Sequence, residues 1–170
     1  RRRPGAGPRK TPSPRTPVRI RIVAVGKDRS GLYAPAVEEY AKRIGRYARF
    51  EIVEVPEARR HAGTPRASAE EGEALLARIG ERERVVLLDE LGEEETSLAF
   101  ARRVGRWLER GQDVALVIGG SDGLAPAVRA RATEAIALSR MTLAHRLARL
   151  VLAEQLYRAF TILRGEPYHK

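Results

Sequence analysis

A chain of 170 residues is long enough to form one domain with a buried core, and the absence of cysteine excludes disulfides and thiolate metal sites. Three widely separated histidines argue against a zinc site, so we expect no metal. No apolar run approaches the roughly 20 residues that cross a bilayer, so we expect no membrane span. The net charge is +10, but residues 1–17 carry six basic and no acidic side chains, which leaves 26 basic against 22 acidic residues elsewhere. The rest of the chain is therefore only mildly basic, and its lack of cysteine agrees with a cytoplasmic location.

Residues 1–17 differ in composition from the rest of the chain. They hold five of the ten prolines and almost no apolar side chains. Such a segment cannot bury enough surface to fold. We therefore predict a disordered basic leader over residues 1–17, followed by a single domain over residues 18–170.

The domain is expected to begin with a strand, a helix and a second strand. Residues 18–25 form a β-branched and apolar run that ends at Gly26, which predicts a strand. Apolar residues at helical spacing predict a helix over residues 34–46. A second strand is predicted at residues 50–55, where Pro56 stops it.

A basic segment follows, and we predict a mobile surface loop over residues 57–67. Its cations could contact phosphate or simply be solvated, and they are Arg59, Arg60, His61 and Arg66. Ser68 and Glu71 have the spacing of a capping box, which predicts that the next helix begins at Ser68. This helix is expected to run to residue 79, just before a glycine.

The next strand and helix follow the same alternation. Residues 85–89 form an apolar run that ends in an acid, which predicts a buried strand. The acids at residues 93–95 precede a helix over residues 96–110, where negative charge favours a helix N-terminus. Gly111 is expected to stop this helix, and the spacing of Trp107 predicts a core side chain rather than a base-stacking surface.

The most informative stretch joins a buried strand to a glycine-rich turn. Residues 114–118 are all apolar and end abruptly at Gly119 and Gly120, with Gly123 shortly after. In open α/β sheets, ligands bind outside the carboxyl ends of the strands. The turn is therefore a candidate ligand site, although its glycines could also serve only to make a tight turn.

The remaining elements complete an α/β pattern. A short helix and a short strand are predicted at residues 126–131 and 135–138, followed by a polar turn at residues 139–142 and a long helix at residues 143–163. Alternating strands and helices predict a parallel sheet. No phosphate-binding loop or dinucleotide fingerprint is present, so the residues alone lead to an α/β protein with a glycine-lined crevice and no further.

Six short stretches, taken together, resemble the RlmH family of bacterial methyltransferases. They occur in the family's order and spacing across residues 18–170, and they are RIVAVGK (21–27), LLDELG (87–92), VIGGSDGL (117–124), LSRMTLAH (138–145), EQLYRAF (154–160) and PYH (167–169). The resemblance implies a SPOUT-type Rossmann-like fold, an α/β parallel sheet with a C-terminal trefoil knot. It also implies S-adenosyl-L-methionine as cofactor and a homodimer in which the partner chain completes each site.

The implied reaction is methylation of a pseudouridine at N3 in large-subunit ribosomal RNA, within the assembled ribosome. By position, the resemblance implies a cofactor site formed by Leu88, Gly119, Gly120, Ser139, Arg140, Met141, Thr142, Leu143 and Ala144. It implies RNA contacts from His145, Arg146, Arg149 and Lys170.

The catalytic residues implied by the resemblance lie in the last helix and the C-terminal tail. His169 is expected to act as a general base or an orienting group, and Tyr168 to position the substrate. Glu154 and Arg158, which also suit an i,i+4 surface salt bridge, are expected to bind the base or steady the tail.

The chain departs from the family in two places. Ala144 stands where the family usually has proline, which predicts a looser turn, and family members start near Val18, so we expect the native protein to start there. Two other functions remain open, a SPOUT methyltransferase acting on tRNA and a non-catalytic ribosome-binding factor. Binding of S-adenosyl-L-methionine would separate the enzyme from the factor.

Overall fold

The computed structural model describes residues 17–170, so the predicted disorder of the leader lies outside the described residues apart from Pro17. Its elements are β1 (Arg19–Val25), α1 (Ala34–Ile44), β2 (Arg49–Val55), the 3-10 turn η1 (Arg59–His61), α2 (Pro65–Leu76), β3 (Arg84–Glu94), α3 (Ser97–Arg110), β4 (Val114–Ile118), α4 (Pro126–Arg131), β5 (Glu134–Ala137) and α5 (His145–Leu163).

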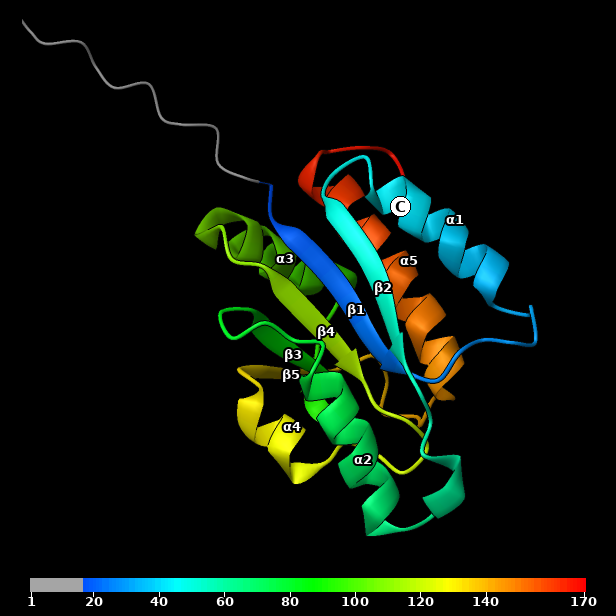
Figure 1. The fold of residues 1–170 in the computed structure, drawn as a ribbon. Helices are drawn as coiled ribbons and strands as arrows, with labels where there is room; N and C mark the ends of the chain where they lie inside the picture. Colours follow the sequence, from blue (N-terminus) through cyan, green and yellow to red (C-terminus); the bar gives the residue numbers. More distant parts are fainter. Residues whose placement is uncertain (1–16) are drawn as a thin grey trace, which may run out of the picture.

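Five strands form one sheet in the order β2-β1-β4-β3-β5, and every neighbouring pair is parallel. The predicted α/β architecture with a parallel sheet is therefore confirmed (Figure 1). All five residues of β4 are buried, as expected for a strand covered on both faces. The chain also departs from sequential pairing, because β4 inserts between β1 and β3.

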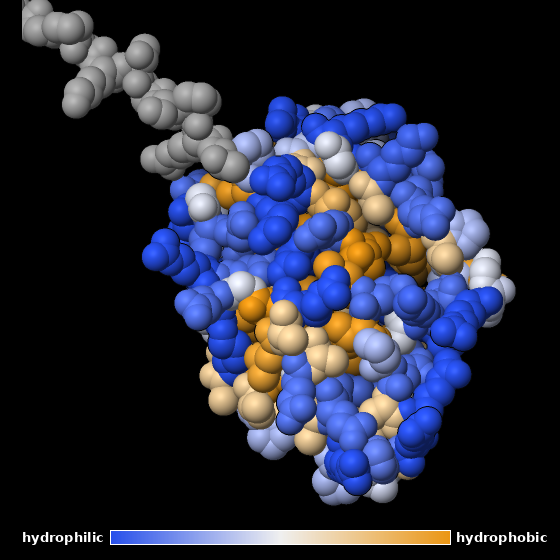
Figure 2. Space-filling view, viewed as in Figure 1, coloured by the Kyte–Doolittle hydropathy of each residue, from blue (hydrophilic) through white to orange (hydrophobic). Residues whose placement is uncertain are grey.

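Helices cover both faces of the sheet. Ile20 and Ile22 of β1 pack in a core with α1, α3 and α5, whereas Val23 and Val25 face a second core shared with α2 and α4. Figure 1 shows α2 and α4 in front of the sheet and the other three helices behind it. On the front face, Figure 2 shows an apolar band across the middle with hydrophilic side chains around it. The trefoil knot stays a prediction.

The predicted start of the second helix is wrong. The helix α2 begins at Pro65, within the segment predicted as a loop, because proline fixes the backbone angle that the first helical turn needs. Ser68 lies inside the helix, where its Oγ donates to the carbonyl oxygen of Pro65 at 3.1 Å. Glu71 is buried and accepts a hydrogen bond from Ala58 N at 3.0 Å, so it does not close a capping box. The regular helix ends at Leu76, three residues earlier than predicted.

The strand β3 is longer than its apolar run predicts. It continues to Glu94 with a register shift against β5 between Leu88 and Glu93. The acids at residues 93–95 do more than place negative charge before a helix. Arg103 of α3 pairs with Glu93 at 2.7 Å and with Glu95. The cap itself is confirmed at Thr96, whose Oγ1 accepts from Ala99 N at 3.1 Å. Trp107 is 1% exposed, so its predicted core position is also confirmed.

Arg103 joins three elements through charge. Besides Glu93 and Glu95, it pairs with Glu134 of β5, a carboxylate that also accepts from Arg84 and from the indole nitrogen of Trp107. Its side chain is 10% exposed. Its guanidinium therefore ties α3 to the far edge of the sheet.

We expect Arg103→Ala to lower the free energy of unfolding by about 3–5 kcal/mol, because it leaves carboxylates uncompensated at sites with little solvent. The neighbouring Arg102→Ala is a matched control, since Arg102 is exposed and should change the stability by no more than about 0.5 kcal/mol. Urea denaturation of both variants measures the difference, and equal stabilities would contradict a structural role for the network.

Candidate active site

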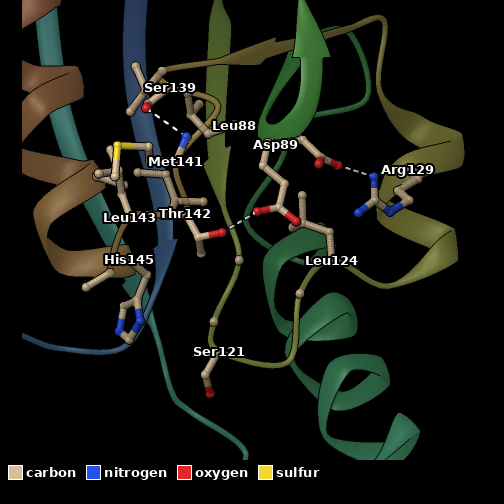
Figure 3. A pocket seen from close by; sticks show the side chains of 18 residues that line it. Leu88, Asp89, Ser121, Leu124, Arg129, Ser139, Met141, Thr142, Leu143 and His145 are labelled. Carbon is tan, nitrogen blue, oxygen red and sulfur yellow. Dashed lines mark hydrogen bonds and ion pairs between the residues drawn. The ribbon is translucent and has the colours of Figure 1, made fainter.

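A cavity of about 570 Å³ lies at the carboxyl end of β4 and beside the middle of β3, where β3 stops pairing with β4 (Figure 3). Its walls come from this part of β3, the glycine turn after β4, α4 and the segment that leads into α5. The residues that line it are Leu88, Asp89, Glu90, Ile118, Gly119, Gly120, Ser121, Gly123, Leu124, Arg129, Leu138, Ser139, Met141, Thr142, Leu143, Ala144, His145 and Ala148.

The glycine turn both closes tightly and lines the cavity. Gly123 has a φ of +80°, which favours glycine, and its amide donates to the carbonyl oxygen of Gly120 at 3.1 Å. A Cβ on Gly120 would lie 2.7 Å from Glu71 Oε2 and 3.1 Å from Val25 Cγ1. A Cβ on Gly119 would lie 3.0 Å from Leu124 Cδ2. The turn therefore has structural reasons for glycine and also presents bare backbone to the cavity.

The facing wall is the segment between β5 and α5. Ser139 Oγ accepts from Met141 N at 2.9 Å, and Thr142 Oγ1 donates to Glu90 Oε2 at 2.7 Å (Figure 3). Ala144 has a φ of −55°, which is close to the angle that proline would impose. The backbone therefore has a proline-like φ at this position although the residue is alanine.

Every predicted cofactor residue lines this cavity except Arg140. The side chain of Arg140 is 87% exposed and pairs with Glu94 at 2.9 Å on the outside of the wall.

Two acids and a histidine add polar groups to the mostly apolar walls. Asp89 pairs with Arg129, and Figure 3 shows this pair on the α4 side of the cavity. His145, predicted to contact RNA, lines the cavity. Burial, followed by the charge of Arg146, lowers the pKa of His145. Its Nε2 is buried and lies 3.7 Å from Glu57 Oε1, too far for a hydrogen bond.

Sequence reasoning did not select several of these residues. Asp89 and Glu90 follow the apolar run of β3 directly, so the rule that strand ends line ligand crevices could have found them. Arg129 lies on a separate helix and has no comparable signal.

Glu71 supports the glycine turn from behind. It is 5% exposed, and its Oε1 accepts from Ala58 N while its Oε2 is buried with no hydrogen-bond partner among the described residues. Burial raises the pKa of this carboxyl. Glu71 thus connects the loop after β2 to the cavity wall at Gly120.

The four predicted catalytic residues form a separate cluster. Glu154 Oε1 accepts from Arg158 Nη2 at 2.7 Å and from the Tyr168 hydroxyl at 3.0 Å, and Arg158 Nη1 lies 3.2 Å from His169 Nδ1. The guanidinium of Arg158 also stacks over the Tyr168 ring at 4.7 Å. Burial is the main cause that raises the pKa of Tyr168. The structure therefore brings these four residues together, and their catalytic roles stay predictions.

This cluster does not reach the cavity of its own chain. None of its members lines the cavity. His145, at the start of α5, does, and Glu154 lies nine residues further along the helix, about 13 Å away at 1.5 Å per residue. Figure 1 places the C-terminus at the end of the molecule opposite the carboxyl ends of β1 and β4. Within this chain, the cavity and the tail cluster are therefore two separate places.

The predicted RNA contacts of the last helix are only partly accessible. Arg149 is 4% exposed and donates to Glu54 at 2.5 Å and to the carbonyl oxygen of Gly26 at 2.7 Å, so it holds the core rather than a phosphate. Arg146 is partly exposed and lies 3.3 Å from Glu57. Lys170 is exposed.

No helix within residues 17–170 is long and apolar enough to cross a membrane. The same residues contain no cluster of three or more side chains suited to a metal ion.

Known proteins resemble the chain over this same span. A family model described as "Predicted SPOUT methyltransferase" matches residues 18–169. A protein of Anaeromyxobacter dehalogenans named ribosomal RNA large subunit methyltransferase H is 77% identical over 153 residues, covering 90% of this chain and all of the relative. A protein of the same name from Limosilactobacillus fermentum is 48% identical over 157 residues, covering 89% of this chain and 99% of the relative.

A solved structure supports the fold. A probable methyltransferase from Bordetella pertussis superposes with a TM-score of 0.52 at 20% identity, covering 84% of this chain and 94% of the other.

The raised pKa of Glu71 predicts a pH dependence of stability. The contribution of Glu71 to the free energy of unfolding is fully present below about pH 4, where the carboxyl is protonated in both the folded and the unfolded state. This contribution is lost as the pH rises through the folded pKa. Glu71→Gln should therefore flatten the decline of the free energy of unfolding between about pH 4 and pH 8, measured by urea denaturation.

A neighbouring acid gives the control with the opposite sign. His61 and then Arg66 lower the pKa of the partly exposed Glu70, so its contribution to stability is present above the unfolded pKa and disappears in acid. If Glu71→Gln and wild type show parallel pH profiles, the pKa of Glu71 does not change on folding and the prediction is wrong.

Proposed function

The chain belongs to the SPOUT methyltransferase family and, within it, to the RlmH family, and from this membership we propose that it methylates N3 of a pseudouridine in large-subunit ribosomal RNA. The methyl donor is S-adenosyl-L-methionine, and the substrate is the RNA of the assembled ribosome. The observation that carries this proposal is the cavity, which is built from the glycine turn and the segment before α5, where the resemblance requires a cofactor site.

The cavity fits the cofactor in size and character. Its volume lies within the range of small-molecule sites, and apolar side chains with a few polar groups line it. Leu88, Leu124 and Leu138 would contact the cofactor through apolar side chains, and the bare backbone at Gly119 and Gly120 would offer it hydrogen-bonding groups. When bound, the cofactor supplies an electrophilic methyl group on a sulfonium sulfur.

The tail cluster suits a role in orienting the base. N3 of pseudouridine is an imide N–H, which must lose its proton to water before it can attack a methyl group. A guanidinium only donates, so Nδ1 of His169 accepts from Arg158 and a neutral ring carries its proton on Nε2. That Nε2–H would donate to a ring carbonyl oxygen and stabilise the negative charge that develops there. The arrangement favours His169 as an orienting group over His169 as the general base.

The separation of cavity and tail supports a homodimer. The cavity lies at the start of α5 and the cluster near its end, so a partner chain running the other way would bring its tail to this cavity. We propose that residues 18–170 act as one domain with the family's trefoil knot, and that the dimer works in the cytoplasm, where its ribosomal substrate is.

Methyl transfer from labelled S-adenosyl-L-methionine to ribosomes that lack the modification tests the proposal. We expect label in large-subunit RNA at a pseudouridine, with free ribosomal RNA and tRNA as parallel substrates. Label in tRNA alone would mean that the substrate is tRNA and not ribosomal RNA. If the protein binds the cofactor but transfers no label to any of these RNAs, the proposed reaction is wrong.

Two substitutions separate the roles of His169. His169→Ala should lower kcat about 10²-fold or more with little change in cofactor affinity, because the tail acts on the base. His169→Gln keeps a hydrogen-bond donor but cannot act as a base, so it should recover part of the lost rate. Equal loss in both variants would instead favour the general base.

Mixed dimers test whether each site uses two chains. One subunit carries Gly120→Ala, whose Cβ would meet Glu71 and Val25, and the other carries His169→Ala. Each parent should be nearly inactive, while the heterodimer regains one intact site and about half the wild-type activity. Gly80→Ala is the matched control for the glycine substitution, since its Cβ would be 3.6 Å from the nearest atom. Failure of the mixture to recover would mean that each chain works alone.

A further inference from the structure

Most arginines in the expected RNA-binding regions are already paired with acids. In the last helix, Arg146, Arg149 and Arg158 each pair with a glutamate. In the segment after β2, Arg59 pairs with Glu57, and Arg66 shares Glu70 with His61. A paired guanidinium offers less charge to a phosphate, so these regions attract RNA less than their composition suggests.

The outer face of α3 differs from these regions. Arg102, Arg106 and Arg110 are exposed and recur every four residues, which aligns them along one side of the helix. Within residues 17–170 none of the three forms a salt bridge. Glu109 is also exposed on this side but pairs with none of them, and Arg103 points inward to its three glutamates.

Helix stability does not explain this arrangement. Like charges four residues apart destabilise a helix by a few tenths of a kcal/mol per pair. The helix dipole favours Arg110 in the last turn, but it does not favour Arg102, which lies two turns earlier. Core packing does not explain the line of Arg102, Arg106 and Arg110, the arginine stripe, either. The buried residues of α3 are on the other side of the helix.

The stripe continues toward the catalytic tail. The helices α3 and α5 run side by side in the same direction, because Ser97 Oγ donates to Gln155 Oε1 at 2.7 Å and a Cβ on Gly105 would lie 3.2 Å from Leu163 Cδ2. Arg164 follows directly after Leu163, is exposed and forms no salt bridge among the described residues. Its guanidinium lies 5.9 Å from the centre of the Tyr47 ring, so a fourth cation stands at the point where the tail begins.

We propose that Arg102, Arg106, Arg110 and Arg164 form the surface that holds the phosphate backbone of the RNA substrate beside the tail that receives the target base. This inference rests on the proposed function. Successive arginines of α3 are about 6 Å apart along the axis, a spacing similar to that of neighbouring phosphates in an RNA strand. Contacts to phosphate carry no sequence information, so this surface positions the RNA while the tail and cavity select the base.

The test is the triple variant Arg102→Gln, Arg106→Gln and Arg110→Gln in the full chain. A second triple variant, Arg29→Gln, Arg78→Gln and Arg82→Gln, removes the same charge from exposed arginines elsewhere. Binding to unmodified large ribosomal subunits is measured across a series of salt concentrations, together with methyl transfer, S-adenosyl-L-methionine affinity, melting temperature and oligomeric state.

We expect the α3 variant to bind the subunits at least about tenfold more weakly at low salt and to lose about two units of slope in log K against log salt. The KM for subunits should rise while kcat, cofactor affinity and melting temperature stay near wild type. The control variant should behave as wild type.

Several outcomes would overturn the inference. One is equal losses in the two triple variants, which would indicate a general effect of net charge. Another is a change of oligomeric state in the α3 variant with unchanged RNA binding, which would make this face a protein contact. Methylation of the subunits by the wild-type protein tests the proposed function separately. If the wild type methylates the subunits and the α3 variant binds them equally well, the proposed RNA-binding surface is wrong and the proposed function stands.

Discussion

The parallel pairing of β4 between β1 and β3 is the constraint on which the rest of the structure depends. All five residues of β4 are buried, and its neighbours run in the same direction, so their carboxyl ends meet at one edge of the sheet. The chain must turn sharply there, and Gly120 and Gly123 make that turn without side chains. The cavity follows from this geometry, because the same edge also receives the middle of β3, where it stops pairing with β4, and the segment that leads into α5.

Charge serves two different purposes in this protein. Some guanidiniums act inside the fold, as Arg103 does when it joins α3 to the strand edge and as Arg149 does between α5 and the end of β1. Each is surrounded by carboxylates or carbonyl oxygens, which offset the cost of desolvation. Others, such as Arg106, have no such partners among the described residues and face solvent. The net charge of the sequence does not separate the two groups, but burial and pairing do.

In the proposed function, the reaction centre uses groups from two ends of each chain. The cavity is mostly apolar, with a few polar side chains in its wall, which suits a small cofactor. The tail cluster is polar, and its hydrogen bonds fix the orientation of His169 through Arg158 and that of Tyr168 through Glu154. A methyl acceptor needs orientation and charge stabilisation, whereas a methyl donor needs a shaped pocket, so the two halves have different chemical requirements.

Local pattern determined the elements of this fold and their type. Apolar runs gave the strands, helical spacing gave the helices, and family resemblance gave the cavity residues and the tail. The errors came from local signals that compete, since Ser68 and Glu71 have the spacing of a capping box but Pro65 begins the helix, and tertiary contacts take up Glu71. Pairing partners, the burial of Arg149 and the separation of cavity from tail depend on residues far apart in the chain. Only the tertiary structure decided these, because the sequence records which charges are present and not which of them meet.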